Sequence, residues 1–323
     1  MHLPQELRAA VEQEIARAEP ARLAAASAQL SRQYKAGDFS SPAIQTDAQR
    51  AAYLAVRLPA TYAAAWHVFS ELRRRAPEVQ VRSILDLGAG PGTAVLAARQ
   101  VFGELSAATL LESDSAWIAS GKRIADASPG ALPESARWIR HDLGQSHSAD
   151  PHDLVVIAYA LGELHQAQRD AVLKQAWNFC KRYLVLIEPG TVRGFGVVNA
   201  VRSALIAQDA HLLAPCPHQG LCPMAAGDDW CHFAQRLERT SLHRRLKGGD
   251  LGHEDEKFSY IIGSKAAADA AKARIVRHPM KHGGHVKLAL CTPAGLEAKT
   301  VTRSQKQAYK LARQAVWGQT WEE

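Results

Sequence analysis

The chain has 323 residues, 47% of them hydrophobic and 22% charged, which is enough for one large domain with additions or for two moderate domains. No apolar run reaches the roughly 18 residues that a membrane span requires, so no membrane-spanning segment is expected. The first 35 residues contain four glutamates and no apolar core of the signal-peptide type. Neither a secretory signal nor an acid-poor transit peptide fits that composition, and we therefore expect the protein in the cytoplasm. We also expect it to be a monomer.

The net charge of +7 is unevenly distributed along the chain. Residues 235–323 contain 17 Lys and Arg against 9 Asp and Glu, a balance of +8, which leaves −1 for residues 1–234. Clustered basic residues of this kind contact polyanions, most often nucleic acid, and a solvated helix face is the alternative explanation. The basic runs are Arg236, Arg239, Arg244, Arg245 and Lys247, and then Arg303, Lys306, Lys310 and Arg313.

The N-terminal quarter of the chain is rich in alanine and has helical periodicity. Apolar residues recur there at helical spacing in two sets, and Pro59 is expected to break the helix before the second set. We interpret residues 1–78 as a helical cap on the following domain. The two apolar sets are Leu7, Val11 and Ile15, and Tyr62, Trp66 and Phe69.

Short apolar segments then alternate with amphipathic ones. This alternation predicts an α/β fold, a parallel sheet with helices on both faces. The expected strands are Ser83–Leu87, Ala108–Glu112, Ala136–Arg140, Leu154–Tyr159 and Tyr183–Glu188. The expected helices are Thr93–Phe102, Trp117–Asp126 and Gln166–Lys181.

Two more strands are expected in the same sheet, Phe258–Gly263 and His285–Thr292. About 70 residues separate the first of them from the strand that ends at Glu188, which is far longer than a usual crossover. This segment contains three cysteines, so we interpret it as an inserted unit. The expected divisions are a cap at 1–78, an α/β domain at 79–200 with 257–293, a cysteine-rich insert at 201–256 and a basic tail at 294–323.

Glycines stand at alternate positions between the first strand and the next helix. Missing side chains let the backbone approach a ligand, and a helix N-terminus attracts a carboxylate or phosphate. The Gly-x-Gly-x-Gly spacing resembles the first motif of S-adenosylmethionine-dependent methyltransferases. Glu112 is placed to accept hydrogen bonds from ribose hydroxyls, and Asp142 from an adenine amino group. The expected cofactor-binding residues are Asp86, Gly88, Ala89, Gly90, Gly92, Glu112 and Asp142.

No catalytic residue can be assigned from the sequence. Residues 158–165, after the fourth strand, lack the Asn/Asp-Pro-Pro-aromatic tetrapeptide of methyltransferases that act on base amino groups. Glu163, His165 and Glu188 are ionisable groups near the expected pocket mouth, although a satisfied loop carboxylate or imidazole is the more common case. Cys180 falls on the apolar side of a predicted helix and is expected to be a core residue.

The other four cysteines are the strongest candidates for metal ligands. Cys216, Cys222 and Cys231 lie within sixteen residues, and Cys291 lies at the end of a predicted strand far downstream. In a reducing compartment clustered cysteines bind metal more often than they form disulfides. Four thiolates suit tetrahedral zinc or a 4Fe-4S cube, and the gaps of five and eight residues favour the cluster. His218 and His232 are further candidate ligands.

Several motifs in order resemble the methyltransferase-like proteins of the small ribosomal subunit, a family with mitochondrial and bacterial members. The resemblance implies a class I S-adenosylmethionine-dependent methyltransferase (Rossmann-like) fold, S-adenosylmethionine binding and a 4Fe-4S cluster on the four cysteines. It also implies an assembly or maturation factor on small-subunit ribosomal RNA, with an active ribosomal RNA methyltransferase as the alternative. The motifs are Tyr53–Tyr62, the LDLGAGPGTA loop, Glu188–Thr191, the CPHQGLCP and WCHF segments and Cys291.

Overall fold

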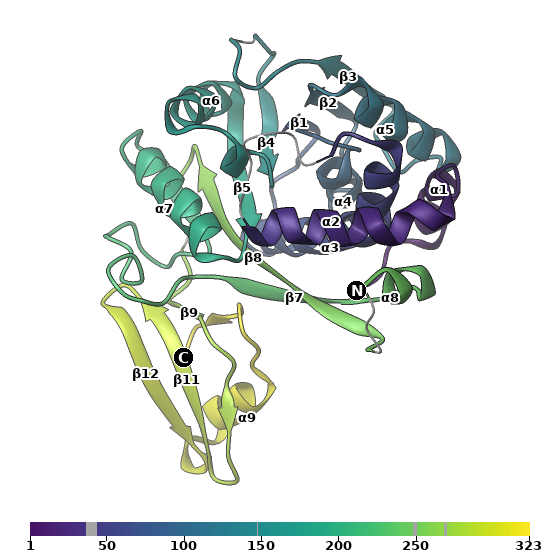
Figure 1. The fold of residues 1–323 in the computed structure, drawn as a ribbon. Coiled ribbons are helices and arrows are strands. Elements are labelled where there is room, and N and C mark those ends of the chain that lie inside the picture. The colour runs from purple at the N-terminus through teal and green to yellow at the C-terminus, as the bar shows by residue number, and fades with distance from the viewer. Residues whose placement is uncertain (37–43, 147, 248–250, 268–269) are drawn as a thin grey trace.

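The computed structural model describes residues 1–36, 44–146, 148–247, 251–267 and 270–323. These residues form a large sheet covered by helices and a small antiparallel sheet near the C-terminus. Figure 1 shows the small sheet, in yellow, extending from one end of the large helix-covered body. In the described residues, no helix combines the length and the apolar composition that crossing a membrane requires.

Among the described residues, three helices precede the first strand, α1 (Gln5–Ile15), α2 (Pro20–Ala36) and α3 (Asp47–Arg75). The capping box at Thr46 starts α3, which then continues through Pro59. The predicted break at Pro59 is therefore wrong. Proline in a helix interior costs roughly 3 kcal/mol, and burial of apolar residues on both sides of it offsets that cost.

The large sheet has the strand order β3-β2-β1-β4-β5-β8-β6, with β7 paired to β8. Strands β1 to β5 are mutually parallel, and β8 is antiparallel to β5. A parallel doubly wound sheet with this reversed strand confirms the predicted class I methyltransferase fold. The strands are β1 (Ser83–Leu87), β2 (Ala107–Glu112), β3 (Ser135–Arg140), β4 (His152–Ala158), β5 (Cys180–Pro189), β6 (His211–Ala214), β7 (Phe233–Glu238) and β8 (His253–Ser264).

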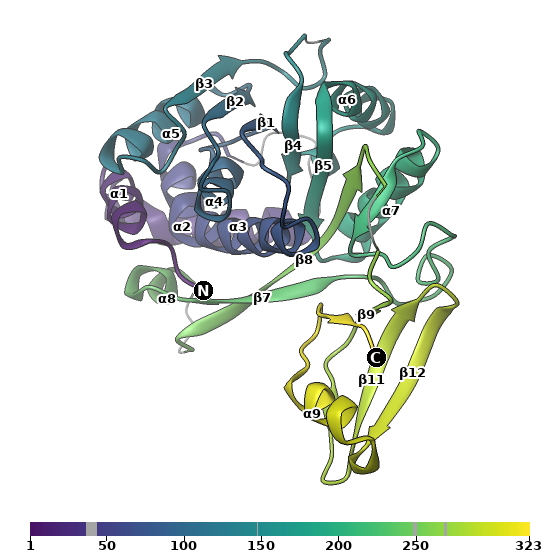
Figure 2. The ribbon, with the colours of Figure 1, turned by 180° about the vertical axis from the view of Figure 1, so that it is seen from behind.

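Helices cover both faces of the large sheet, and each face has its own apolar core. One core joins the sheet to the N-terminal helices and to α4 and α5, and the other joins it to α6 and α7 (Figure 2). A short 3-10 turn, Leu161–Glu163, follows β4. The helices are α4 (Thr93–Val101), α5 (Ser115–Ala127), α6 (Gln166–Phe179) and α7 (Val192–Ile206).

Two predicted elements end or begin elsewhere in the structure. Helix α6 ends at Phe179, so Cys180 opens β5 instead of lying on a helix, and burial raises the pKa of its thiol to about 12. Strand β8 begins at His253, five residues before the predicted start, because its first half pairs with β7. The inserted segment therefore contributes β6 and β7 to the large sheet and is not a separate unit.

The small sheet contains the strand that was expected in the large one. His285–Thr292 is β11, and it pairs along its whole length with β12. Val286, Leu288 and Leu290 are buried and alternate with more exposed residues, as expected for an antiparallel strand with one covered face. Residues 294–323 are thus part of a folded unit, and the predicted tail is wrong. The elements are β9 (Ala273–Ile275), β10 (Met280–Lys281), β12 (Gly295–Thr302), a 3-10 turn (Arg303–Gln305), α9 (Lys306–Gln314) and β13 (Thr320–Trp321).

Arg274 on β9 connects the small sheet to the rest of the protein. Its side chain is only 1% exposed and forms an ion pair of 2.8 Å with Glu71 of α3, which is equally buried. It also donates to the carbonyl oxygens of Pro215 and Gly318, each at 2.9 Å. A buried charge with this many partners fixes the small sheet against α3 and against the loop after β6.

Candidate functional site

A cavity of about 1640 Å³, here called the large cavity, opens where β1, β2, β4 and β5 end and is bordered by α2 and α3. In a doubly wound sheet the carboxyl ends of the strands are the usual place for a ligand. Six of the seven predicted cofactor-binding residues line it. They are Asp86, Gly88, Ala89, Gly90, Glu112 and Asp142, whereas Gly92 caps α4 behind the loop.

The glycine loop adopts a backbone that other residues rarely reach. Gly88, Gly90 and Gly92 have φ angles of 79°, 53° and 84°. A Cβ at Gly88 would come within 2.6 Å of the Cβ of Ala160, so that position accepts only glycine. A Cβ at Gly90 would meet no atom within 4 Å. The loop is therefore closely packed on one side at Gly88 and open at Gly90.

Asp86 gives the clearest sign of a ligand in the large cavity. Its side chain is 1% exposed, and neither carboxylate oxygen has a hydrogen-bond partner among the described residues. Burial, together with the nearby charge of Glu112, raises its pKa to about 8. A buried carboxyl group without a partner is unfavourable on its own, and a cationic or hydrogen-bond-donating ligand group would satisfy it.

Glu112 and Asp142 lie at the cavity edge with their carboxylates held by backbone N–H groups. Glu112 accepts from Gly90 at 2.8 Å and from Asp114 at 2.9 Å, and Asp142 accepts from Gly144 at 2.8 Å. Their contacts to ribose and adenine remain predictions.

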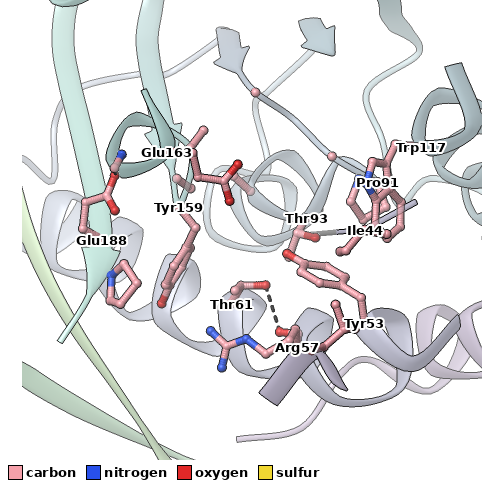
Figure 3. A pocket seen from close by; sticks show the side chains of 18 of the residues that line it. Ile44, Tyr53, Arg57, Thr61, Pro91, Thr93, Trp117, Tyr159, Glu163 and Glu188 are labelled. Atoms are coloured by element: carbon pink, nitrogen blue, oxygen red, sulfur yellow. Dashed lines mark hydrogen bonds between the residues drawn. The ribbon is translucent and has the colours of Figure 1, made fainter. Parts of the chain in front are cut away.

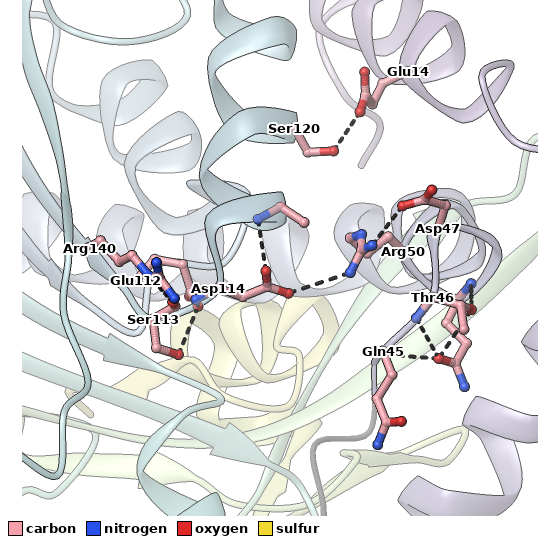
Figure 4. A network of polar contacts seen from close by, with 12 residues as sticks. Glu14, Gln45, Thr46, Asp47, Arg50, Glu112, Ser113, Asp114, Ser120 and Arg140 are labelled. Carbon is pink, nitrogen blue, oxygen red and sulfur yellow. Dashed lines mark hydrogen bonds and ion pairs between the residues drawn. The ribbon is translucent and has the colours of Figure 1, made fainter.

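The loop after β2 is also connected to the N-terminal helices. Asp114 accepts from Arg50 of α3 at 3.5 Å, and Arg50 also pairs with Asp47 (Figure 4). Ser120 on α5 donates to Glu14 of α1 at 2.5 Å. The wall of the large cavity is thus tied to the helical cap.

Aromatic and basic side chains also line the large cavity, and the sequence did not predict them as site residues. Figure 3 shows Tyr53, Arg57 and Tyr159 around the large cavity. Arg57 forms a bidentate ion pair with Glu256, at 3.0 and 2.9 Å, and the Tyr159 hydroxyl donates to the same carboxylate at 3.3 Å. Tyr53 and Arg57 are four residues apart on α3, a spacing that in sequence equally fits a helix face packed in the core.

Two of the three ionisable groups that the sequence placed near the pocket mouth line the large cavity. Burial raises the pKa of Glu188 to about 7, and its carboxylate accepts from the Gly162 N–H at 2.9 Å. Desolvation by the cavity wall and the nearby Glu112 likewise raise the pKa of Glu163 to about 7, although its side chain is exposed to the open cavity. His165 is exposed at the start of α6 and lies outside the described cavity lining. Both glutamates can exchange protons near neutral pH.

The four candidate ligand cysteines line one second cavity of about 30 Å³, here called the thiol cavity. Cys216 and Cys222 follow β6, Cys231 precedes β7 and Cys291 lies on β11, so the thiols meet at the junction of the two sheets. Cys291 was expected at the end of a strand of the large sheet, and that expectation is wrong because β11 belongs to the small sheet. Within the described ranges, no group of three or more His, Cys, Asp or Glu side chains is arranged to hold a metal ion.

The two candidate histidines differ in their position relative to the thiols. The Nε2 atom of His218 lies 3.7 Å from the sulfur of Cys291, and His218 lines the thiol cavity. His232 instead stacks on Trp230, with ring centroids 5.0 Å apart, and packs edge-on against Trp317. Of these two histidines, only His218 lines the thiol cavity.

Arg202 of α7 is a buried cation beside these thiols. It is 4% exposed, and its Nε donates to the sulfur of Cys216 at 3.4 Å. Its Nη2 donates to the carbonyl oxygens of His218 at 3.0 Å and Gly220 at 2.6 Å. Burial raises the pKa of the Cys216, Cys231 and Cys291 thiols, that of Cys291 to about 12. In the sequence, the only signal that could have pointed to Arg202 is its position among the apolar residues of α7.

The family model described as mitochondrial small ribosomal subunit Rsm22 matches residues 47–322. The chain belongs to this family. The resemblance found in the sequence is thereby confirmed, and the match includes both the glycine loop and all four clustered cysteines.

Curated relatives share this family region. The human ribosome assembly protein METTL17, mitochondrial, is 28% identical over 284 residues, covering 82% of this chain and 61% of the relative. An Rsm22-cox11 tandem protein of Schizosaccharomyces pombe is 28% identical over 335 residues, covering 84% and 43%. The chain thus spans about half the length of these relatives. The names of these relatives describe them as mitochondrial proteins, and this finding overturns the predicted cytoplasmic location.

Solved structures include distant matches. The magnesium protoporphyrin IX methyltransferase of Synechocystis, solved with bound SAM, has a TM-score of 0.42 and 10% identity and matches 64% of this chain and 80% of its own. An O-methyltransferase family protein of Burkholderia thailandensis has a TM-score of 0.44 and 14% identity, with coverages of 68% and 59%. The fold assignment rests on the strand order given above.

Proposed function

We propose that this Rsm22 family member is an assembly or maturation factor of the small ribosomal subunit. In this proposal it binds S-adenosylmethionine in the large cavity, holds a 4Fe-4S cluster in the thiol cavity and contacts ribosomal RNA as a monomer. The observation that carries the proposal is the family match over residues 47–322, together with relatives named as ribosome assembly proteins. Because those relatives are mitochondrial, we extend their location to this chain.

The cofactor assignment is supported by the buried carboxyl group of Asp86. The amino group of S-adenosylmethionine is a cation that would satisfy it, while Glu112 and Asp142 would bind ribose and adenine. When bound, this cofactor supplies an activated methyl group. Calorimetry with S-adenosylhomocysteine tests the assignment, and a folded wild-type protein that shows no binding at millimolar ligand would overturn it.

The metal assignment is supported by the charge of Arg202. Within the described part of the chain, its N–H groups donate to sulfur and carbonyl oxygen and to no carboxylate. Four thiolates around a zinc ion or a 4Fe-4S cluster carry a net negative charge, which would compensate this buried cation. Cys216, Cys222, Cys231 and Cys291 would be the ligands. Metal there would crosslink the two sheets, so metal binding and folding would be coupled.

The RNA contact is supported by the charge of the small sheet. Residues 270–323 contain 10 Lys and Arg against 3 Asp and Glu, a balance of +7. Lys281, Lys287, Lys306 and Lys310 are all exposed there. Clustered exposed lysines bind phosphate in a salt-dependent way.

The basic run at residues 236–247 is less available for RNA. Arg236 pairs with Asp255, and Arg239 and Lys247 pair with Glu254. Arg244 and Arg245 lie on α8 (Ser241–Lys247), which packs against α2 and α3. In Figures 1 and 2 this helix lies well away from α9, so the two basic runs do not form one continuous face.

The assembly role is tested by co-sedimentation. In extracts fractionated on sucrose gradients, the protein should travel with immature small subunits and leave them as salt rises. Removal of the protein should reduce the yield of mature small subunits while leaving large subunits unchanged. Equal loss of both subunits, or migration only as free protein, would overturn the proposed role.

Methyl transfer to ribosomal RNA is a second candidate function. It is favoured by Glu163 and Glu188, whose pKa values of about 7 suit proton transfer, and by Tyr159, which has a φ of 58° at the large cavity. Strained backbone and perturbed ionisable groups concentrate at functional sites. The test is transfer of labelled methyl groups to immature small-subunit RNA. Activity in wild type that is lost in Gly90→Val would favour this function over a purely structural role.

A further inference from the structure

The large cavity and the thiol cavity share one wall, formed by α7 and the turn before it. Residues of this segment alternate between the two cavities along the helix. Those that line the large cavity are Thr191, Arg193, Gly194 and Val197. Those that line the thiol cavity are Phe195, Val198, Asn199 and Arg202. A displacement of the start of α7 would therefore alter both cavities.

Trp230 makes a second connection between the cavities. It precedes Cys231 in the chain and packs in the same apolar cluster as Cys222, Cys231 and Cys291. Its indole Nε1 donates to the carbonyl oxygen of Gly190 at 2.9 Å, and Gly190 lines the large cavity. One side chain thus links the segment that carries a thiol to the wall of the other cavity.

The turn that Trp230 contacts has no space in which to adjust. The Gly190 N–H donates to the carbonyl oxygen of Lys257 at 2.9 Å, and a Cβ at Gly190 would lie 2.7 Å from the Phe258 backbone nitrogen. A Cβ at Gly194 would lie 2.0 Å from the carbonyl oxygen of Pro189. Closely packed segments transmit a displacement instead of absorbing it.

We propose that the two cavities are coupled binding sites and that the Trp230 hydrogen bond to Gly190 carries the coupling. This inference rests on the proposed function of both cavities. Ligation of Cys231 fixes the adjacent Trp230, which holds Gly190 and the start of α7 in the geometry that binds the nucleoside cofactor. Without ligation the hydrogen bond is free to break, and the wall of the large cavity loses this support. Coupling between sites is reciprocal, so cofactor binding also favours retention of metal.

The coupling is tested on full-length protein reconstituted anaerobically with iron and sulfide and on the same protein after chelation. We expect chelation to weaken S-adenosylhomocysteine binding by roughly 5-fold or more, a typical size for coupled sites. Trp230→Phe keeps the aromatic ring and removes the N–H donor, so its reconstituted form should bind as weakly as its chelated form. Trp317→Phe is the matched control, because the buried Trp317 Nε1 in the same aromatic cluster has no partner among the residues that the structure describes.

The outcomes separate this inference from the proposed function. If reconstituted wild type does not bind S-adenosylhomocysteine, the cofactor assignment and the coupling both fail. If reconstituted and chelated wild type bind equally, only the coupling fails. If both tryptophan variants lose the difference, the assignment to the Gly190 hydrogen bond is wrong. A reciprocal measurement tests the coupling even if Trp230→Phe folds poorly. In wild type and in Trp317→Phe, S-adenosylhomocysteine should slow the loss of iron to a chelator.

Discussion

The large cavity and the thiol cavity are built in opposite ways. The large cavity takes its key residues from the ends of neighbouring parallel strands, and its glycine loop is a short continuous motif. The thiol cavity takes its cysteines from both sheets, with Cys291 seventy-five residues after Cys216. The first is formed by the large sheet and the N-terminal helices, whereas the second requires the small sheet to be docked. Mutations that weaken docking of the small sheet should therefore affect the thiol cavity more than the large cavity.

The largest expected effect is on ligand binding at the large cavity. Gly90→Val places a side chain in open cavity space, so binding of S-adenosylhomocysteine should be abolished while the protein still folds. Gly130→Val is the matched control, because Gly130 also has a positive φ and open space but lies outside the cavity lining. Both variants should lose roughly 1–2 kcal/mol from backbone strain. Calorimetry should then show binding only in the control.

The thiol cavity should depend more strongly on docking of the small sheet. Arg274→Met removes the buried partner of Glu71 and should lower the free energy of unfolding by roughly 3–5 kcal/mol. The exposed pair of Arg236 with Asp255 supplies the control, and Arg236→Met should change stability little. Urea denaturation measures both. Equal, small effects in the two variants would show that the buried pair does not hold the sheets together.

Protonation of Asp86 should make stability depend on pH. Its folded pKa of about 8 lies above the ordinary value of 3.8, so the folded state holds a proton that the unfolded state has lost. Stability should fall as pH rises between these values, by roughly 2 kcal/mol from about pH 6 to pH 8. Asp86→Asn should remove this dependence and also weaken cofactor binding. Parallel pH profiles of urea unfolding for both proteins measure it.

The smallest effect is expected on RNA binding, and it compares the two basic regions. Charge reversal of Lys306 and Lys310 should reduce the slope of log affinity against log salt by about 0.7–0.9 for each phosphate that the variant no longer neutralises. Charge reversal of Arg244 and Arg245 on α8 should change it less, because that helix lies away from the small sheet. Filter binding to small-subunit RNA across a salt series measures both slopes. A larger change for the α8 variant would move the interface to that helix.

The sequence predicted the features that depend on local signals. The strand–glycine loop–helix unit at residues 83–101 and the acidic strand end at Glu112 lie where their motifs indicated. Strand alternation was enough to predict a parallel α/β sheet, and the family resemblance implied the class I fold. The sequence predicted a helix break at Pro59, whereas α3 continues through it, because burial of α3 outweighs the local effect of proline.

Features that depend on long-range contacts were not predictable from the sequence. The pattern of His285–Thr292 predicts a strand but not which sheet contains it, and here β12 provides the partner. Arg57 and Arg202 have no local sequence signal that marks them as site residues, because only the tertiary structure brings them to Glu256 and to the thiols. The spacing of the cysteines and the family resemblance predicted that the four thiols come together. They did not predict that the thiols lie between the two sheets.

Metal content tests the central contrast most directly, since the three cysteines of residues 216–231 and Cys291 of β11 can form one site only if the two sheets are docked. Protein purified anaerobically should contain iron and sulfide in equal amounts. Replacing Cys216, Cys222, Cys231 or Cys291 by serine should abolish both, whereas Cys180→Ser in the core of the large sheet should retain them. Zinc in place of iron would replace the proposed cluster by a zinc site on the same four thiolates. Wild-type protein without metal, whose thiols all react freely, would contradict the account.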